Sequence, residues 1–300
     1  MRKRIPSPWK KRFFTWPISG VMAWFAYHLI GVFPIDLGSA VLGKLFRFIG
    51  PQLPISKRAR IHMRACFPSW NEIDLEANVR DMWENLGRAA AEFPHIQNLD
   101  VSGRDKRVEV IGVEHIHSLR DDGKPGIVFS AHLGNWELLP MLAHPNGLDM
   151  HFVYRALNSP LAEKVLRRHY NKLSERLIPK GREGAIQMAH VLRDGGHLAI
   201  MVDQKLNEGL DIPFFGKPAK TSAALASFAL RHRCPVVPAR VERLSGANFR
   251  VTFYPAINLP NSGVTQADLV ELLTQVNKQI ESWIRDTPSQ WLWLHRRWGK

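Results

Sequence analysis

Residues 126–139, GIVFSAHLGNWELL, have the pattern of a short strand that ends at a histidine and leads into a helix. The run from Gly126 to Ala131 is predominantly apolar, which is typical of a strand buried on both faces of a sheet. Gly134 lies two residues after His132, Asn135 comes next and suits a helix N-cap, and Glu137 falls in the first helical turn. Because open α/β sheets bind their ligands where strands end and helices begin, this stretch predicts the fold and the site together.

The chain after residue 100 alternates short apolar runs with helical patterns. Strands are predicted at 108–111, 126–131, 151–154, 197–202, 235–241 and 249–254, and helices at 136–143, 160–176, 183–193, 219–232 and 266–285. Earlier in the chain, Asn71 is a candidate N-cap for a long amphipathic helix over residues 72–96. Strands separated by helices indicate an α/β fold, with a sheet covered by helices on both faces.

Positive charge is concentrated near the N-terminus. The 300 residues contain 41 Lys and Arg against 27 Asp and Glu, which gives a net charge of +14. Residues 1–70 hold twelve basic residues and one acid, Asp36, and so carry +11 of that charge. Such a region attracts nucleic acid or an anionic membrane surface. The two cysteines, Cys66 and Cys234, form neither a disulfide framework nor a CxxC motif, which fits a reducing compartment.

An apolar segment, Phe13–Phe33, lies between two groups of basic residues. Its 21 residues include no Asp, Glu, Lys or Arg, and this length suffices to cross a bilayer. Its basic flanks and Trp residues favour membrane contact, either as a transmembrane helix or as an in-plane or re-entrant helix. Residues 35–50 continue with an amphipathic helical pattern. We therefore divide the chain into a basic arm with a membrane segment (1–34) and a domain (35–300) that is helical over 35–100 and α/β over 101–300.

The sequence matches few of the common catalytic or metal-binding motifs. The sequence has no Walker A loop and no GxGxxG, HExxH or GxSxG motif, so it does not support an NTPase, a dinucleotide-binding enzyme, a zincin or a serine hydrolase. His115 and His117 have no third ligand nearby and are interpreted as a surface pair, so no metal is expected. Four histidines precede an acid with the spacing His-x4-Asp/Glu, but only His132 follows a strand and enters a Gly-Asn turn.

The pair of His132 and Glu137 suits acyl transfer. A neutral imidazole accepts the proton of a hydroxyl group that attacks a thioester. A carboxylate beside the imidazole selects its tautomer and stabilises the imidazolium that forms. The sequence therefore predicts His132 as the general base and Glu137 as its partner. A capped helix that merely happens to follow a histidine is the structural alternative.

Several blocks of the sequence resemble one family. The 126–139 stretch resembles the His-x4-Asp/Glu block of lysophospholipid-type acyltransferases, and most closely that of the lauroyl/myristoyl acyltransferases of lipid A biosynthesis. Further blocks agree in order over about residues 15–298: Tyr154-Arg155 with Asn158 and Pro160, Asp203-Gln204, Pro213-Phe214-Phe215-Gly216 with Thr221, the VVP of 236–238, and a Trp/Arg-rich end. Ala131 stands where glycerol-phosphate acyltransferases usually have Asn, and an EGTR block is absent, which disfavours a simple lysophosphatidic acid acceptor.

This resemblance implies a fold and a reaction. The fold is a mixed central sheet with helices on both faces, glycerolipid-acyltransferase-like, with an N-terminal membrane-associated helix. The enzyme is expected to use no cofactor and to transfer a fatty acyl chain from acyl carrier protein, or acyl-CoA, to a hydroxyl of an anionic membrane phosphoglycolipid, most simply a lipid A precursor. The implied substrate-binding residues are Arg155, Asn158, Asp203, Gln204, Phe215 and Gly216.

Individual roles follow from the same resemblance. Arg155 is expected to hold a phosphate or the developing oxyanion, or else to form a strand-end salt bridge. Asp203 is expected to orient Arg155 or the site loop. Phe214 and Phe215 either line an acyl groove or belong to the core. The aromatic and basic residues near the C-terminus are expected to act as interfacial anchors: Trp291, Trp293, Arg296, Arg297 and Trp298.

The resemblance also implies a location. Acyl carrier protein is cytosolic, so the catalytic domain should face the cytoplasm at the bacterial inner membrane, which favours an in-plane or re-entrant Phe13–Phe33. Three alternatives stay open: a phosphatidylinositol-mannoside or other glycerolipid acyltransferase, a non-enzymatic basic protein of the membrane surface, and a nucleic-acid binder. The last is disfavoured because its basic clusters flank an apolar segment, so no nucleic acid is expected as a partner.

Overall fold

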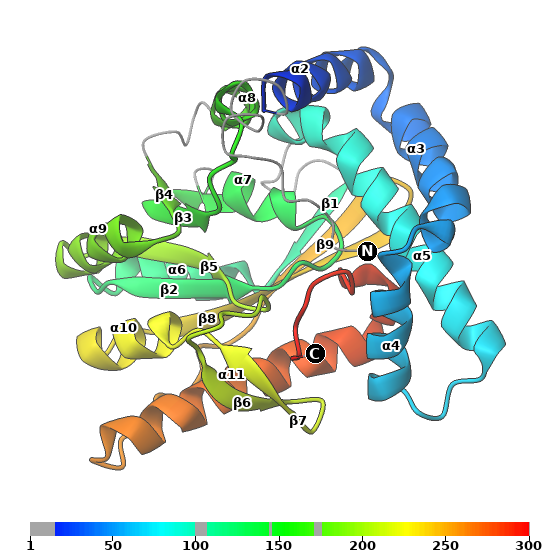
Figure 1. The fold of residues 1–300 in the computed structure, drawn as a ribbon. Helices are drawn as coiled ribbons and strands as arrows, with labels where there is room; N and C mark the ends of the chain where they lie inside the picture. Colours follow the sequence, from blue (N-terminus) through cyan, green and yellow to red (C-terminus); the bar gives the residue numbers. More distant parts are fainter. Residues whose placement is uncertain (1–15, 100–106, 144–145, 171–175, 300) are drawn as a thin grey trace.

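A seven-stranded mixed sheet forms the centre of the protein in a computed structural model, which describes residues 16–99, 107–143, 146–170 and 176–299 (Figure 1). The β8–β9 pair is antiparallel and the other neighbours are parallel, so the predicted mixed sheet is confirmed. All six predicted strands are present. The order across the sheet is β1 (Val108–Ile111), β9 (Asn248–Phe253), β8 (Val236–Ser245), β2 (Gly126–Ser130), β5 (His197–Met201), β3 (Met150–Tyr154) and β4 (Leu177–Pro179).

Helices cover both faces of this sheet, as predicted. Alternate residues of a strand point to opposite faces, and in β2 Ile127 and Phe129 belong to one hydrophobic core while Val128 belongs to the other. The first core includes side chains of α9 (Arg182–Arg193), α10 (Ala224–His232) and α11 (Thr265–Asp286). The second includes side chains of α6 (Val113–Asp121), α7 (Leu139–Ala143) and the C-terminal end of α8 (Pro160–His169).

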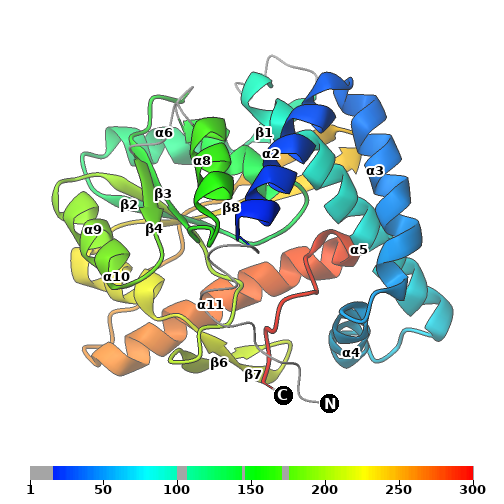
Figure 2. The ribbon, with the colours of Figure 1, turned by 45° about the horizontal axis from the view of Figure 1, so that its top comes forward.

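Four N-terminal helices pack beside the sheet (Figures 1 and 2): α2 (Trp16–Val32), α3 (Ile35–Ile49), α4 (Ser56–Cys66) and α5 (Glu72–Glu92). A short 3₁₀ turn, η3 (Phe93–Asn98), extends α5. The predicted cap is confirmed, because Asn71 Oδ1 accepts a hydrogen bond from the backbone N–H of Asp74 at 2.9 Å. Helices α3 and α5 pack closely, since Gly87 has no side chain and a Cβ there would lie 2.5 Å from the carbonyl oxygen of Leu42.

Helix α2 covers most of the predicted membrane segment. It packs against α8, where Gly20 lies so close that a Cβ on it would be 2.6 Å from Ser159 Oγ. Its other sides are apolar and exposed, with Met22 at 67% and Phe25 at 59% exposure. Phe13 to Thr15 lie outside the described residues. Within the described ranges, no helix combines the length and the hydropathy that crossing a membrane requires.

Several local predictions differ from the structure, and the helix predicted over residues 160–176 ends at His169. Residues 219–221 are not helical, because β7 (Lys217–Thr221) pairs antiparallel with β6 (Leu210–Phe214), and α10 begins only at Ala224. The hairpin turn has Phe215 at φ 50° and Gly216 at φ 69°, the left-handed pair that a two-residue hairpin turn needs. Strand β4 was not predicted, since three residues are too few to show a periodicity.

Part of the N-terminal positive charge is neutralised within the fold. Arg47 pairs with Asp81, and Glu84 lies 3.1 Å from the same guanidinium group. Two arginines of α4 pair with acids of α5: Arg60 with Glu76, and Arg64 with Glu72. Half of the six basic residues between Lys44 and Arg64 therefore form ion pairs between helices. The net charge alone overstates the positive charge that is available to an external partner.

Candidate active site

His132 and Asp203 meet just beyond the carboxyl ends of β2 and β5. Parallel pairing places Ser130 beside Met201, so the residues two positions further on are neighbours. His132 Nδ1 lies 2.7 Å from Asp203 Oδ1, and the backbone N–H of His132 donates to Oδ2 at 2.9 Å. A carboxylate at Nδ1 keeps the ring proton there, which leaves Nε2 free to accept a proton. Nε2 faces the Gln204 side-chain amide at 3.3 Å.

Asp203 is held in its ionised form. Its side chain is fully buried, which by itself raises the pKa of a carboxyl group. The interaction with the His132 ring, which is strongest when that ring is protonated, and the hydrogen bonds that His132 donates outweigh this, so the pKa of Asp203 lies well below its usual range. Of the two predicted roles of Asp203, orienting Arg155 or the site loop, the contacts agree with the second, because the carboxylate accepts from the His132 backbone N–H as well as bonding its ring.

Glu137 has different partners from those predicted. Its carboxylate accepts hydrogen bonds from Trp136 Nε1 at 3.0 Å and from the Tyr170 hydroxyl group. Residues 136–138 form a 3₁₀ turn, η4, instead of the first turn of an α-helix, so the spacing does not present Glu137 to the imidazole as an α-helical turn would. Burial raises the pKa of Glu137 to about 7, although the Trp136 hydrogen bond and the His132 charge act to lower it. Within the described residues the Glu137 carboxylate thus makes no hydrogen bond to His132, and Asp203 is the carboxylate bonded to the imidazole. The predicted role of Glu137 as the catalytic partner of His132 stays a prediction.

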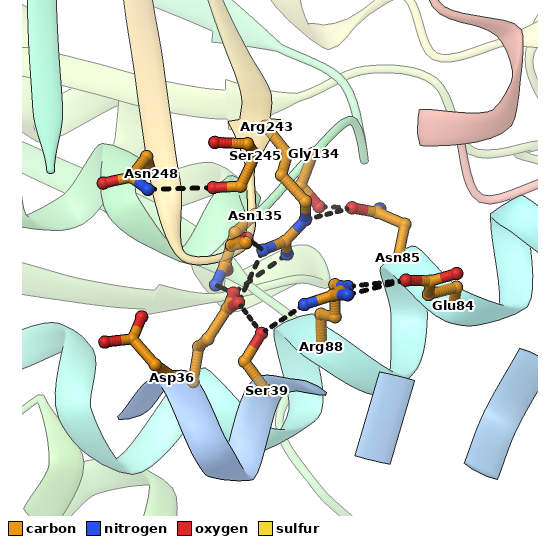
Figure 3. A network of polar contacts seen from close by, with 12 residues as sticks. Asp36, Ser39, Glu84, Asn85, Arg88, Gly134, Asn135, Arg243, Ser245 and Asn248 are labelled. Carbon is orange, nitrogen blue, oxygen red and sulfur yellow. Dashed lines mark hydrogen bonds and ion pairs between the residues drawn. The ribbon is translucent and has the colours of Figure 1, made fainter. Parts of the chain in front are cut away.

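A buried polar network holds the turn that follows β2 (Figure 3). Glu92 at the end of α5 is fully buried and accepts from Asn135 Nδ2 at 2.8 Å and from Arg243 Nη2 at 2.9 Å. Asn85 accepts from Arg243 Nε at 2.8 Å and donates to the Gly134 carbonyl oxygen at 3.0 Å. Asn135 is therefore not the predicted helix cap, and its side chain instead ties the turn to Glu92 at the end of α5.

The C-terminal segment passes directly behind the dyad of His132 and Asp203. Trp291 Nε1 donates to Asp203 Oδ2 at 2.8 Å, and the backbone N–H of Leu292 donates to the His132 carbonyl oxygen at 3.1 Å. The backbone N–H of Gly134 also donates to the Gln290 carbonyl oxygen at 3.1 Å. The Trp/Arg-rich end is thus part of the site scaffold.

This position overturns the expected membrane-anchor role for most of that segment. Trp291, Trp293 and Arg297 are each 0% exposed. Arg297 donates to Thr221 Oγ1 at 2.9 Å and to Asn277 Oδ1 at 3.1 Å, and its guanidinium lies over the Phe214 ring. Burial lowers the pKa of Arg297 to about 10, which still leaves it charged at neutral pH.

His295 is a site residue that the sequence interpretation missed. Its ring centroid lies 4.8 Å from that of His132, and a nitrogen of each ring and an oxygen of Asp203 all lie within 4.8 Å of one another. Three such groups also have metal-ligand chemistry. The two oxygens of Asp203, however, already accept hydrogen bonds from the His132 ring, the His132 backbone and Trp291. These hydrogen bonds explain the burial of the Asp203 carboxylate without a metal ion. No spacing rule relates residue 295 to residue 132.

An apolar cavity of about 290 Å³ opens beside the dyad. It lies between the sheet strands β2, β3 and β5 and the helices α7 and α8, and its lining includes Phe152, Leu142 and Leu166. Polar groups also line it: His132, Glu137, Arg155, Lys180 and Gln204. The arrangement joins a chamber suited to a hydrocarbon chain to a histidine–aspartate dyad.

The other predicted binding residues fall into two groups. Arg155 is exposed just beyond β3 and lines the cavity together with Gln204. Asn158 is exposed before α8 and is not among the described residues that line the cavity. Phe215 and Gly216 form the β6–β7 turn, which the backbone N–H of Phe215 fastens to Glu281 Oε1 at 2.6 Å. They are not among the described residues that line the cavity, and their role in substrate binding stays a prediction. Phe214 is fully buried in the core.

The chain is similar to known acyltransferases. Residues 10–300 match the family described as bacterial lipid A biosynthesis acyltransferase. The lipid A biosynthesis acyltransferase of Haemophilus influenzae is 24% identical over 276 residues, which is 90% of this chain and 84% of that protein. The lipid A biosynthesis myristoyltransferase of Escherichia coli is 24% identical over 271 residues, or 88% and 82% of the two chains.

One solved structure shows a more distant similarity. The 1-acyl-sn-glycerophosphate acyltransferase of Thermotoga maritima aligns with a TM-score of 0.38 and 12% identity, over 87% of this chain and 98% of that chain. The match to the family covers nearly all of this chain, and the curated relatives are named acyltransferases. The protein is therefore an acyltransferase that belongs to the bacterial lipid A biosynthesis acyltransferase family.

Proposed function

We propose that this acyltransferase moves a fatty acyl chain from acyl carrier protein to a hydroxyl group of a lipid A precursor, with His132 as the general base. The observation that carries the proposal is the 2.7 Å contact between His132 Nδ1 and Asp203 Oδ1 at an apolar cavity. It combines an oriented base with room for a hydrocarbon chain. The family and its relatives support the lipid A precursor as the acceptor.

The dyad suits direct acyl transfer without a covalent enzyme intermediate. His132 Nε2 takes the hydroxyl proton while the hydroxyl oxygen forms a bond to the thioester carbonyl carbon. The resulting tetrahedral intermediate collapses, the C–S bond breaks, and the imidazolium returns the proton to the departing thiolate. Asp203 stays ionised throughout, because its pKa is low, and it stabilises the transient imidazolium.

Two cations beside the cavity suit anionic substrates. Arg155 and Lys180 are exposed, and both line the cavity that holds His132. Phosphate groups occur on the prosthetic arm of an acyl carrier protein and on a lipid A precursor, and guanidinium and ammonium groups bind both. We assign Arg155 and Gln204 to substrate binding on this basis.

The exposed apolar surface of α2 and α3 supports attachment to the inner membrane, with the catalytic domain on the cytoplasmic side. The large exposed apolar side chains on these two helices include Met22, Phe25, Val32, Val41 and Phe48. Large exposed apolar side chains gathered on two helices mark a membrane or protein contact. A helix that lies in the interface plane places the domain beside its lipid acceptor and leaves it open to a cytosolic carrier.

Acyl transfer by the full-length protein in detergent tests the proposal. Acyl carrier proteins loaded with chains of several lengths are supplied with a lipid A precursor, and the products are read by mass spectrometry. We expect one added acyl chain, and a loss of at least about 10²-fold in His132→Ala, because general-base catalysis contributes that much or more. His151→Ala is the control, since His151 lies on β3 and does not line the cavity.

Parallel reactions separate the acceptors. A phosphatidylinositol mannoside and a lysophosphatidic acid replace the lipid A precursor at equal concentration, and acyl-CoA replaces the carrier-bound donor. Faster transfer to either alternative lipid would contradict the proposed acceptor. Full activity in His132→Ala would contradict the proposed base.

A further inference from the structure

The apolar cavity beside the dyad follows the direction of the sheet strands. On β2 its lining runs from His132 back to Val128, and on β5 it ends at Ala199. Parallel pairing places Val128 directly beside Ala199, so the lining ends at the same level on both strands. A linear chain whose reactive end lies at His132 therefore extends into the cavity along these strands.

Packed side chains close the far end of the cavity. Gly126 and His197 lie two residues before the last lining residues of β2 and β5, on the same face of the sheet, and neither lines the cavity. A Cβ on Gly126 would be 2.6 Å from Leu119 Cδ2 and 2.9 Å from His197 Cδ2, and His197 Nε2 lies 2.9 Å from the carbonyl oxygen of Leu119. Met150, the strand partner of His197 on β3, does line the cavity. Met150 is therefore the deepest lining residue on the three strands, above a closed floor.

Ala199 leaves space at this deep end. Strand β5 has a paired strand on each side, and Ala199 lies between Val128 and Phe152. A side chain in the middle of a helix-covered sheet is usually buried, but Ala199 is only part-buried and lines the cavity. Its methyl group faces open space, and a larger side chain at position 199 would occupy part of that space.

Depth and volume give the same estimate of chain length. From Val128 to His132 the backbone of β2 advances four positions, or about 13 Å. An extended chain advances about 1.2 Å per bond, so roughly eleven bonds, or twelve carbons, reach from the dyad to the deep end. An apolar cavity of roughly 150 Å³ holds benzene, a ring of six carbons. This cavity, at about 290 Å³, has room for about twice as many.

We propose that Met150 and Ala199 set the length of the acyl chain that the enzyme transfers, with an optimum of about twelve carbons. The inference rests on the proposed acyl transfer and adds the residues that select the donor. The acyl chain lies along β2 and β5, with its thioester carbonyl group at His132 and its methyl end against Met150. A shorter chain leaves the floor without contacts, and a longer chain holds its carbonyl group away from His132.

Two substitutions should move the optimum in opposite directions. Ala199→Leu adds three carbon atoms at the deep end, which leaves less room for the chain, and should shift the optimum to about ten carbons. Met150→Ala removes three heavy atoms from the floor and should shift it to about fourteen. Each shift should change the product ratio of neighbouring even-numbered chains by about tenfold, because two methylenes gain or lose their burial.

A competition assay measures these ratios. Full-length protein in detergent receives an equimolar mixture of acyl carrier proteins loaded with chains of 8 to 16 carbons, together with a lipid A precursor, and mass spectrometry counts the products. The ratio reports only the protein that is folded, and Ala199→Val offers a smaller change that should shift it in the same direction as Ala199→Leu. The double variant of Ala199→Leu and Met150→Ala should return the optimum to that of wild type.

Met141→Ala is the matched control. Met141 is a part-buried methionine of α7 that packs against the second core, but it does not line the cavity, so its loss should leave the optimum unchanged. An unchanged optimum in both Ala199→Leu and Met150→Ala, shifts in the same direction, or an equal shift in Met141→Ala would each overturn the proposal. If wild-type protein transfers no chain of any length, the proposed function fails. Wild-type transfer with an optimum that neither substitution moves refutes this inference alone.

Discussion

Asp203 bonds His132 twice, through the ring nitrogen Nδ1 at 2.7 Å and through the backbone nitrogen at 2.9 Å, although the two residues are 71 positions apart. The carboxylate therefore sets both the tautomer of the imidazole and the position of its backbone. Trp291 donates to the same carboxylate at 2.8 Å and limits its rotation. The structure thus pairs the imidazole with Asp203 through a hydrogen bond, whereas the sequence predicted Glu137 as its partner.

Asp203→Asn should abolish most of the activity while Glu137→Gln retains it. An amide at position 203 no longer holds the Nδ1 proton or stabilises an imidazolium, so we expect kcat to fall by at least about 10²-fold. Glu137→Gln preserves the contacts with Trp136 and Tyr170, and we expect kcat within about threefold of wild type. Acyl-transfer rates from pH 5 to 9 provide the measurement. A Glu137→Gln protein that folds normally but is as inactive as Asp203→Asn would restore the partnership of Glu137 with His132.

Glu137→Gln should also change how stability depends on pH. The folded-state pKa of Glu137 is raised to about 7, above that of an unfolded chain, so folding favours the protonated acid. The associated stability is fully present below the unfolded pKa and is lost as pH rises through 7. The neutral Gln variant should therefore match wild type near pH 4 and exceed it at pH 9, by at most about 3 kcal/mol. Thermal unfolding at both pH values measures this, and a constant difference between the two proteins would contradict the burial of an ionisable Glu137.

Loss of Glu92 should destabilise the whole fold. Glu92→Leu removes the carboxylate that pairs with Arg243 and leaves this arginine buried beside the turn that follows β2. Breaking a buried ion pair in this way costs about 3–5 kcal/mol of folding stability. The exposed pair of Glu109 and Arg250 offers the control, since Glu109→Leu should change stability by less than about 1 kcal/mol. Melting temperatures provide the comparison. Equal small effects would show that the network in Figure 3 contributes little to stability.

Arg155→Lys should reduce activity without affecting stability. Arg155 is exposed at the cavity, and lysine keeps its charge but lacks the planar pair of donors that a phosphate or oxyanion engages. We expect at least about a tenfold loss of kcat/KM and an unchanged melting temperature. Arg193→Lys, an equally conservative change at an exposed position on α9, is the control. Normal kinetics in Arg155→Lys would mean that a point charge suffices there.

Polar substitutions on α2 should release the protein from membranes. Met22→Ser, Phe25→Ser and Val32→Ser together remove three large exposed apolar side chains, which should weaken binding to vesicles of phosphatidylglycerol and phosphatidylcholine at high salt. Ile73→Ser is the matched control, because Ile73 is 78% exposed, close to the 81% of Val32, but lies on α5. Vesicle flotation provides the readout. Unchanged binding of the triple variant would place the membrane contact elsewhere.

The sequence by itself determined the parts of this protein that depend on neighbouring residues. Six strands, the Asn71 cap and the position of His132 at the end of β2 all follow from periodicity and local hydrogen bonding, which short stretches encode. The family blocks located Asp203 and Gln204 as site residues for the same reason, since each is a short motif at a strand end. The folded structure retains these predicted features because no contact with a distant part of the chain competes with the local interactions that form them.

Only the tertiary structure decided which groups pair. Glu137 is five residues from His132, but a 3₁₀ turn and the Tyr170 hydroxyl group give its carboxylate different partners. Asp203 and His295 reach His132 because parallel strand pairing and the returning C-terminal segment bring residues 71 and 163 positions away to one place. The basic and aromatic C-terminal residues have the composition of a membrane anchor, yet Trp291, Trp293 and Arg297 are buried. Composition reports what a side chain can do, whereas burial and hydrogen-bond partners, which depend on the whole chain, decide what it does.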